Sequence, residues 1–136
     1  MTDCLFCKIV KGEVPSIKVY EDNEFLAFLD IVPINKGHTL VIPKKHSVNI
    51  YDTDDEILKK MGPLLKKLSL AIKKSTNADG INVSTNVEKA AGQVVFHLHF
   101  HIMPRFEEDG HKHWHGSKLD FDEGKKIAEN IRKQLD

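Results

Sequence analysis

Histidine and apolar residues alternate strictly in the stretch HLHFHIM, residues 97 to 103. Successive side chains of a β-strand point to opposite faces, so a strand would carry the imidazoles on one face and the apolar groups on the other. The imidazole face would comprise His97, His99 and His101, and the apolar face Phe96, Leu98, Phe100 and Ile102. A helix would scatter both sets around its axis. The alternation therefore predicts a strand.

The three imidazoles cannot all serve one centre. Two residues advance a strand by roughly 6 to 7 Å, so the Cα atoms of His97 and His101 would lie about 13 Å apart. Zinc–nitrogen bonds are about 2.0 Å, so neighbouring histidines can share one ion but the outer two hardly can. A purely structural role is disfavoured, because three imidazoles on one face are costly to bury without partners. One end of the row could therefore bind a metal while the other performs chemistry.

Strand signals recur along the rest of the chain. The expected strands are residues 17–22, 24–30, 38–43, 80–86 and 93–104. The first two flank the turn Asp22-Asn23, which is typical of a hairpin. Residues 4–11, followed by Gly12, are compatible with a short helix.

Two longer helices are expected. Thr53, followed three residues later by Glu56, is a capping-box signature, and apolar residues then recur at helical spacing as far as Ile72. Asp120 and Glu123 offer a second cap before a C-terminal amphipathic helix. The fold class that fits is α+β, with about five antiparallel strands in one sheet, one long helix, a short N-terminal helix and a C-terminal helix.

Composition points to one ordinary domain. The 136 residues are 40% hydrophobic, which is enough for one core, so a single domain over residues 1–136 is expected. Lys plus Arg (20) balances Asp plus Glu (20), which argues against nucleic acid as a partner. The N-terminus lacks an apolar leader segment, and no run approaches the roughly 20 apolar residues of a membrane span. We therefore expect a cytoplasmic protein that does not bind membranes.

The two cysteines form the pair Cys4-Leu5-Phe6-Cys7. Such a C-x-x-C pair occurs both in redox motifs and as half of a zinc site. A thioredoxin-like motif needs a parallel βαβ unit, which the expected antiparallel sheet does not supply. A zinc half-site is therefore preferred, with histidines at the edge of the sheet as candidates for the missing ligands. Spacing alone does not identify which histidines these are.

A second alternating run, HKHWH at residues 111 to 115, differs from the first. It lies between two glycines, and Lys112 rather than an apolar residue separates its first two histidines. We expect it to form a solvated loop.

The stretch HLHFHIM resembles the signature of the histidine triad (HIT) family. The segments CLFCKIVKGEVPS (4–16), FLAFLDIVP (25–33), GHTLVIPKKH (37–46) and NVEKAAGQ (86–93) are similar to the Hint-like branch, and to its zinc-binding, prokaryotic-style members in particular. The match spans residues 4–106. The resemblance therefore implies a HIT-like core over 4–106 and a C-terminal extension over 107–136.

This resemblance implies a homodimer that binds purine nucleotides of the AMP or GMP type. His99 would be the nucleophile that forms a nucleotidyl-histidine intermediate. His101 would contact the phosphate and the leaving group, and His38 would line the same pocket. Family transferases carry Gln in place of His101, so a hydrolase is favoured. The C-terminal tail would approach the partner subunit's pocket, and Trp114 could take part.

The resemblance also implies the remaining binding residues. The phosphate would be held by Asn86, Gly92, Gln93 and Val94, and the ribose hydroxyls by Asp30. The base would contact Phe6, Ile9, Phe28 and Ile31, although these four residues could equally be core. A structural zinc ion would be held by Cys4, Cys7, His46 and His97.

Three functions are compatible with this set. The first is hydrolysis of purine nucleoside 5′-phosphoramidates, or related nucleotidyl conjugates, to the nucleoside monophosphate. The second is hydrolysis of dinucleoside polyphosphates. The third is a nucleotide-binding or adaptor protein without catalysis, in which zinc only braces the fold.

Overall fold

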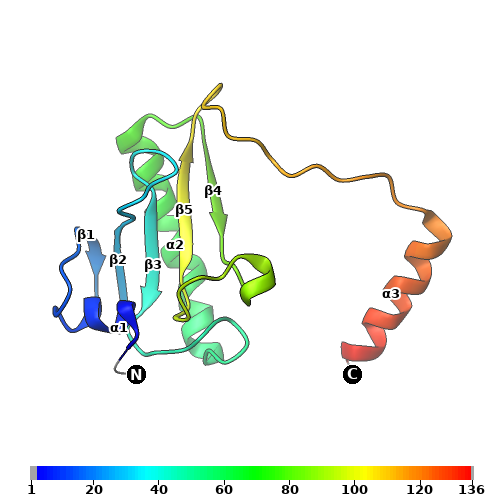
Figure 1. Ribbon diagram of the computed structural model, residues 1–136, viewed down its shortest axis with the longest axis horizontal. Helices are drawn as coiled ribbons and strands as arrows, with labels where there is room; N and C mark the ends of the chain where they lie inside the picture. The colour runs from blue at the N-terminus through cyan, green and yellow to red at the C-terminus, as the bar shows by residue number, and fades with distance from the viewer. Residues whose placement is uncertain (1–2, 136) are drawn as a thin grey trace.

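Five antiparallel strands form one sheet in the order β1-β2-β3-β5-β4. The computed structural model describes residues 3–135. The strands are β1 (Lys18–Glu21), β2 (Phe25–Leu29), β3 (Thr39–Pro43), β4 (Gly80–Ser84) and β5 (Phe100–Arg105). The helices are α1 (Leu5–Val10), α2 (Asp55–Thr76) and α3 (Phe121–Leu135), with a 3-10 turn, η1 (Lys89–Ala91). The expected α+β class is confirmed (Figure 1).

The central strands β2 and β3 are buried on both faces. On one face, side chains of β2, β3 and β5 pack against α2, in a cluster of Phe25, Ala27, Val41, Met61, Leu64, Leu68, Ile72 and Ile102. On the other face, alternate residues pack against α1, in a cluster of Phe6, Ile9, Leu26, Phe28, Leu40 and Ile42. Burial on both faces explains why these strands read as continuous apolar runs, FLAFL and TLVIP.

Helix α2 begins one residue later than the capping box predicts. Its N-cap residue is Asp54, whose side chain makes no capping hydrogen bond. The Thr53 hydroxyl instead donates to the Asn49 carbonyl at 2.7 Å and lies 2.6 Å from the Ser47 hydroxyl. The capping-box interpretation is therefore wrong, because Thr53 closes the preceding loop rather than the helix.

Strand β5 is shorter than the predicted strand over residues 93–104. Its pairing with β3 runs only from Val41↔Phe100 to Thr39↔Ile102. The ladder stops short of Pro43, which has no N–H to donate. His97 and His99 therefore precede the strand, and Leu98 between them is buried. Phe96, predicted to lie on the same face as Leu98, is 49% exposed.

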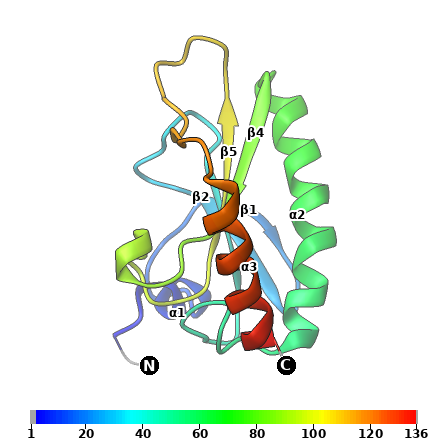
Figure 2. The same ribbon diagram turned by 90° about the vertical axis from the view of Figure 1, so that its right-hand side faces the viewer.

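The C-terminal helix forms as predicted but stands away from the sheet (Figure 1), and in the side view of Figure 2 it lies in front of the sheet. The Asp120 side chain accepts a hydrogen bond from the Asp122 N–H at 3.1 Å, as a cap would. Residues 111–115 are exposed, as expected for a solvated loop, and no described residue of α3 is buried. Within residues 3–135, no helix has both the length and the apolar character needed to cross a membrane.

Candidate functional site

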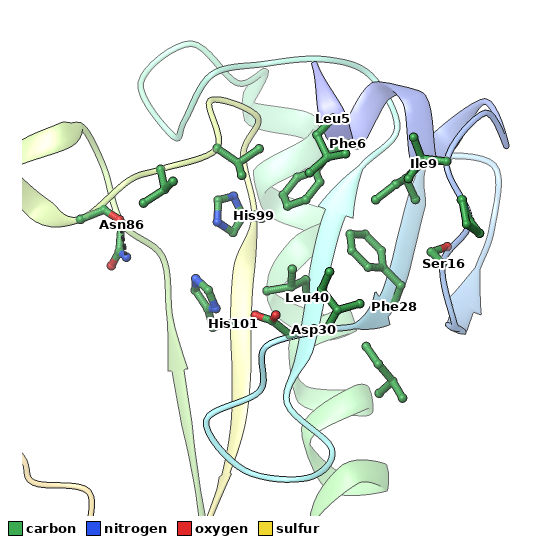
Figure 3. Close-up of a pocket in the computed structure, with 17 residues that line it drawn as sticks. Leu5, Phe6, Ile9, Ser16, Phe28, Asp30, Leu40, Asn86, His99 and His101 are labelled. Atoms are coloured by element: carbon green, nitrogen blue, oxygen red, sulfur yellow. Dashed lines mark hydrogen bonds between the residues drawn. The ribbon is translucent and has the colours of Figure 1, made fainter. Parts of the chain in front are cut away.

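A cavity of about 350 Å³ opens on the α1 side of the sheet (Figure 3). Its lining residues are Leu5, Phe6, Ile9, Val14, Pro15, Ser16, Phe28, Leu29, Asp30, Ile31, Leu40, Asn86, Gly92, Val94, Val95, His99 and His101. Figure 3 shows an apolar side, with Ile9 and Phe28, and a polar side, where Asn86 lies across from the two histidines. Such a division suits a ligand with one aromatic and one anionic part.

The cavity brings together most of the residues predicted to bind substrate. Of the predicted set, only His38 and Gln93 do not line it, and both are buried. The sequence reasoning missed several wall residues, namely Leu5, Val14, Pro15, Ser16, Leu29, Leu40 and Val95. Wall and core residues look alike in an apolar stretch, so the sequence contains no separate indication that these residues line a cavity. All of them except Val95 lie in segments that resemble the family.

His99 keeps one ring nitrogen free. Its Nδ1–H donates to the His97 carbonyl at 2.7 Å, since a carbonyl can only accept. In the neutral ring the lone pair is then on Nε2. Burial lowers the pKa of His99, opposed by the hydrogen bond to His97 and by the charge of Asp30. The Phe6 ring stands edge-on to it, with 5.1 Å between ring centroids. The hydrogen bond at Nδ1 thus holds the His99 ring in place, and in its neutral form the ring is suited to nucleophilic attack through Nε2.

The backbone sets the position of the proton on His101 through His38. The Ile34 N–H donates to Nδ1 of His38 at 3.0 Å, so the proton of neutral His38 is on Nε2. This Nε2 lies 2.9 Å from Nδ1 of His101 and donates to it. Burial, followed by the neighbouring His99 and His38, lowers the pKa of His101 to about 4. His101 is therefore a neutral ring whose Nε2 carries an N–H donor at the cavity.

Asp30 lies beside this histidine pair. Its Oδ1 accepts from the Val32 N–H at 2.9 Å, and its Oδ2 lies 3.6 Å from Nε2 of His38. Asp30, His38 and His101 are close enough to hold a metal ion. However, His38 uses both nitrogens in hydrogen bonds, so the trio is better suited to positioning a proton and binding hydroxyl groups.

The loop between β4 and β5 forms the polar wall of the cavity. Gly92 has a φ of +95°, and a Cβ there would meet Asn86 Nδ2 at 3.3 Å. Glycine therefore permits Asn86 Nδ2 to donate to the Gly92 carbonyl, also at 3.3 Å. The N–H groups of Gly92 and Gln93 bond within the loop, whereas that of Val94 donates to no protein acceptor within residues 3–135. Val94 lines the cavity, and its N–H is therefore a candidate donor to a bound ligand.

Four sulfur and nitrogen donors converge beside the histidine row, from Cys4, Cys7, His46 and His97. Nδ1 of His97 lies 3.2 Å from Nδ1 of His46. The same atom lies 3.4 Å and 3.6 Å from the Sγ atoms of Cys4 and Cys7. Tetrahedral zinc, with bonds of about 2.0 Å to nitrogen and about 2.3 Å to sulfur, needs separations of ~3.3 Å between nitrogens and ~3.5 Å between nitrogen and sulfur. The observed separations fit such an ion.

Hydrogen bonds to the surrounding backbone orient these donor atoms toward one another. Nε2–H of His97 donates to the Pro43 carbonyl at 2.8 Å, which leaves the Nδ1 lone pair facing the cysteines. Sγ of Cys4 accepts from the Cys7 N–H at 3.3 Å at the start of α1, which keeps both thiols on one side. Burial and the adjacent Cys4 raise the pKa of Cys7, and a divalent cation would oppose that rise. Four protein ligands would leave no position for water.

The fold, the histidine row at the cavity and the adjacent cluster of two cysteines and two histidines are together those of a histidine triad protein. A family model described as the HIT domain matches residues 11–108. The chain therefore belongs to the HIT family.

Relatives match over most of the chain. An uncharacterized HIT-like protein of Borreliella burgdorferi is 48% identical over 90% of this chain and 89% of its own length. An adenosine 5′-monophosphoramidase of Candida albicans is 38% identical over 97% of this chain and 91% of its own. An adenylylsulfatase of Arabidopsis thaliana is 45% identical over 79% of this chain and 54% of its own. The family thus includes hydrolases beside uncharacterized members.

Solved structures agree with the fold. A crystal structure of a Streptococcus mutans protein, 45% identical, superposes with a TM-score of 0.95 over 100% of this chain and 87% of that one. A zinc-bound histidine triad family protein of Mycobacterium smegmatis is 40% identical, with a TM-score of 0.76 over 98% of this chain and 96% of its own.

Proposed function

We propose that this protein hydrolyses purine nucleoside 5′-phosphoramidates, or related nucleotidyl conjugates, to the nucleoside monophosphate. The observation that carries the proposal is the hydrogen bond from His99 Nδ1–H to the His97 carbonyl, which leaves Nε2 as a nucleophile at the cavity. The similarity of this chain to an adenosine 5′-monophosphoramidase supports the choice of substrate.

The substrate would lie along the cavity with its base on the apolar side. Phe6, Ile9 and Phe28 would pack on the base, and the exposed Ile31 would cover its edge. The Asp30 carboxylate would accept the ribose hydroxyls. The phosphate would then lie between His99 and the wall of the β4–β5 loop, where the Asn86 side chain, Gly92 and the Val94 N–H meet it.

The reaction would proceed in two displacements. Nε2 of His99 bonds to phosphorus as the phosphorus–nitrogen bond of the N-protonated substrate breaks, and a neutral amine leaves. The His101 Nε2–H stabilises the phosphoryl oxygens by a hydrogen bond. Water then attacks phosphorus, which releases the nucleoside monophosphate, a proton and His99 with its lone pair restored. Both displacements keep the His99 Nδ1–H on the His97 carbonyl.

Trapping the intermediate tests this function. Wild-type protein is mixed with adenosine 5′-phosphoramidate, quenched within milliseconds and digested for mass spectrometry. We expect an adenylyl group on the peptide that contains residues 97–103, and no adduct in His99→Ala. Lys66→Ala, at an exposed position on α2 away from the cavity, serves as the control and should give the wild-type adduct. An adduct elsewhere, or turnover without any adduct, would reject the assignment.

A second candidate substrate class comes from another relative. The adenylylsulfatase among the relatives favours an adenylyl conjugate with an acidic leaving group. Comparing kcat/KM for adenosine 5′-phosphoramidate, adenylyl sulfate and a dinucleoside polyphosphate separates the possibilities. Binding of AMP without turnover of any of the three would instead support an adaptor.

We further propose that the metal is a structural zinc ion held by the cluster of Cys4, Cys7, His46 and His97. The donor spacing and the zinc-bound relative support this identity. When bound, the ion would tie α1 to the segment before β5. Phe6 lies between the two cysteines in sequence, so the same ion would also steady one wall of the cavity.

We also propose that the chain is one domain, with a core over 4–106 and an extension over 107–136, that works as a homodimer. Exposed apolar side chains on α3, including Ile127, Ile131 and Leu135, support a role for the extension in association. Light scattering coupled to gel filtration tests the assembly, and a monomeric mass would reject it.

A further inference from the structure

Gln93 is buried beside the polar wall of the cavity, with 3% of its surface exposed. Its side-chain oxygen accepts from the Glu88 N–H at 2.8 Å. Its side-chain nitrogen donates to the Val48 carbonyl at 2.6 Å and to the Val95 carbonyl at 3.2 Å. Because one end of the amide meets a donor and the other meets two acceptors, only one orientation satisfies all three bonds. The side-chain amide of Gln93 is thus bonded to the protein backbone at both its oxygen and its nitrogen.

These bonds hold a loop whose backbone is strained. Glu88 has a φ of +75°, a conformation that residues other than glycine adopt only when their surroundings impose it. Gln93 forms hydrogen bonds with both the N–H and the carbonyl of Glu88. The Glu88 N–H donates to the side chain of Gln93, and the Gln93 N–H donates to the Glu88 carbonyl at 3.1 Å. This reciprocal pair closes the turn that carries Gly92.

The same side chain sets the backbone around Val94. The bond from Gln93 to the Val95 carbonyl spans Val94 and therefore restrains both peptide planes beside it. The bond to Val48 connects the loop to the segment after β3, two residues beyond His46. Residues 86–95 are therefore anchored to a part of the chain that also carries a metal-binding residue.

We propose that Gln93 is a positioning residue for the substrate phosphate, an inference that rests on the proposed function. Its side chain does not touch the substrate. It holds residues 86–95 in the shape that presents Asn86 and the Val94 N–H to the phosphate. This role differs from the direct phosphate contact that the family resemblance implies for Gln93.

Two variants of Gln93 test the proposal. Gln93→Met keeps the length of the side chain without its polar groups, and Gln93→Glu keeps the acceptor for Glu88 but loses both donors. Gln134→Met, at an exposed position on α3, is the matched control. Calorimetry measures the affinity for AMP and for adenosine, which lacks the phosphate, and hydrogen exchange measures the protection of residues 86–95.

For Gln93→Met we expect AMP to bind roughly 10-fold more weakly, adenosine to bind as in the wild type, and the loop amides to exchange about 10-fold faster or more. We expect kcat/KM for adenosine 5′-phosphoramidate to fall by about 30-fold, since misplaced donors affect the transition state more than binding. Gln134→Met should match the wild type in every measurement.

Several outcomes would overturn the proposal. Weaker AMP binding with unchanged loop exchange would mean that Gln93 contacts the phosphate directly. An equal loss for AMP and adenosine would mean a general structural defect. If Gln93→Met does not fold, the affinities for AMP and adenosine and the loop exchange are measured on Gln93→Glu instead. If the wild type does not bind AMP, the proposed function fails, whereas faster loop exchange in the variants would still support the anchoring role.

Discussion

The two ends of the histidine row use the same side chain in opposite ways. At the end beside the cysteines, where the zinc ion is proposed (the metal end), His97 donates through Nε2 to the Pro43 carbonyl and turns Nδ1 toward Cys4. At the cavity end, His99 donates through Nδ1 to a carbonyl and leaves Nε2 at the cavity. Whichever nitrogen is tied to a carbonyl leaves the other with the lone pair. Burial lowers the pKa of both rings and so favours their neutral forms, in which the hydrogen-bond partner decides which nitrogen keeps the lone pair.

Replacing one ring at each end should give the largest effect. In His99→Ala we expect kcat/KM for adenosine 5′-phosphoramidate to fall by about 10³-fold or more, with the metal content unchanged. In His97→Ala we expect the metal to be lost, because one of its four ligands is gone. Steady-state kinetics and elemental analysis on both variants check this contrast. A His99→Ala protein that loses its metal, or a His97→Ala protein that keeps it, would contradict the division of roles between the two ends of the row.

Removing the metal tests the metal end alone. Treatment with a chelator should lower the free energy of unfolding by on the order of 3 kcal/mol or more, since the bound ion stabilises only the folded state. Denaturant titrations before and after chelation measure the change. Adding zinc back is the control and should restore the original midpoint, whereas an unchanged midpoint after complete metal removal would show that the cluster does not brace the fold.

Acidification tests the cavity end. The pKa of His101 is about 4 in the folded protein against 6.5 ordinarily, so the unfolded chain binds more protons between these values. Stability from this ring is therefore complete above pH 6.5 and is lost as the pH falls toward 4. We expect a loss on the order of 2 kcal/mol, less than the full shift would give because the ring is partly exposed and solvent screens it. Unfolding at several pH values should show a shallower decline in His101→Gln, and identical slopes for the two proteins would contradict the burial argument.

The smallest effect is expected at His38, which acts through His101. In His38→Gln the proton of His101 is no longer confined to Nε2, so part of the population would present a lone pair to the phosphate. We expect kcat to fall by about 10-fold with KM nearly unchanged. The exposed Lys66→Gln variant on α2 is the control and should have wild-type kinetics. A change confined to KM would instead indicate a role in binding.

Much of the site followed from the sequence pattern. The alternation in residues 97–103 predicted a strand, and residues 100–105 do form β5. The resemblance selected four candidate metal ligands, and the structure brings together all four, Cys4, Cys7, His46 and His97. The sequence did not predict the exposure of Phe96, because the paired strand begins only at Phe100. The capping-box prediction failed at Thr53, whose hydroxyl found a nearer carbonyl in the preceding loop.

By itself, the sequence determined which chemical groups exist and which of them share a side of the chain. Identity and spacing are enough for that, since backbone geometry has few periods. The tertiary structure alone decided which nitrogen of each histidine is free and that Gln93 anchors a loop. The partners in those bonds are backbone groups of Pro43, Ile34 and Val48. Every residue has a carbonyl and nearly every one an N–H, so only folding selects which of them a side chain meets.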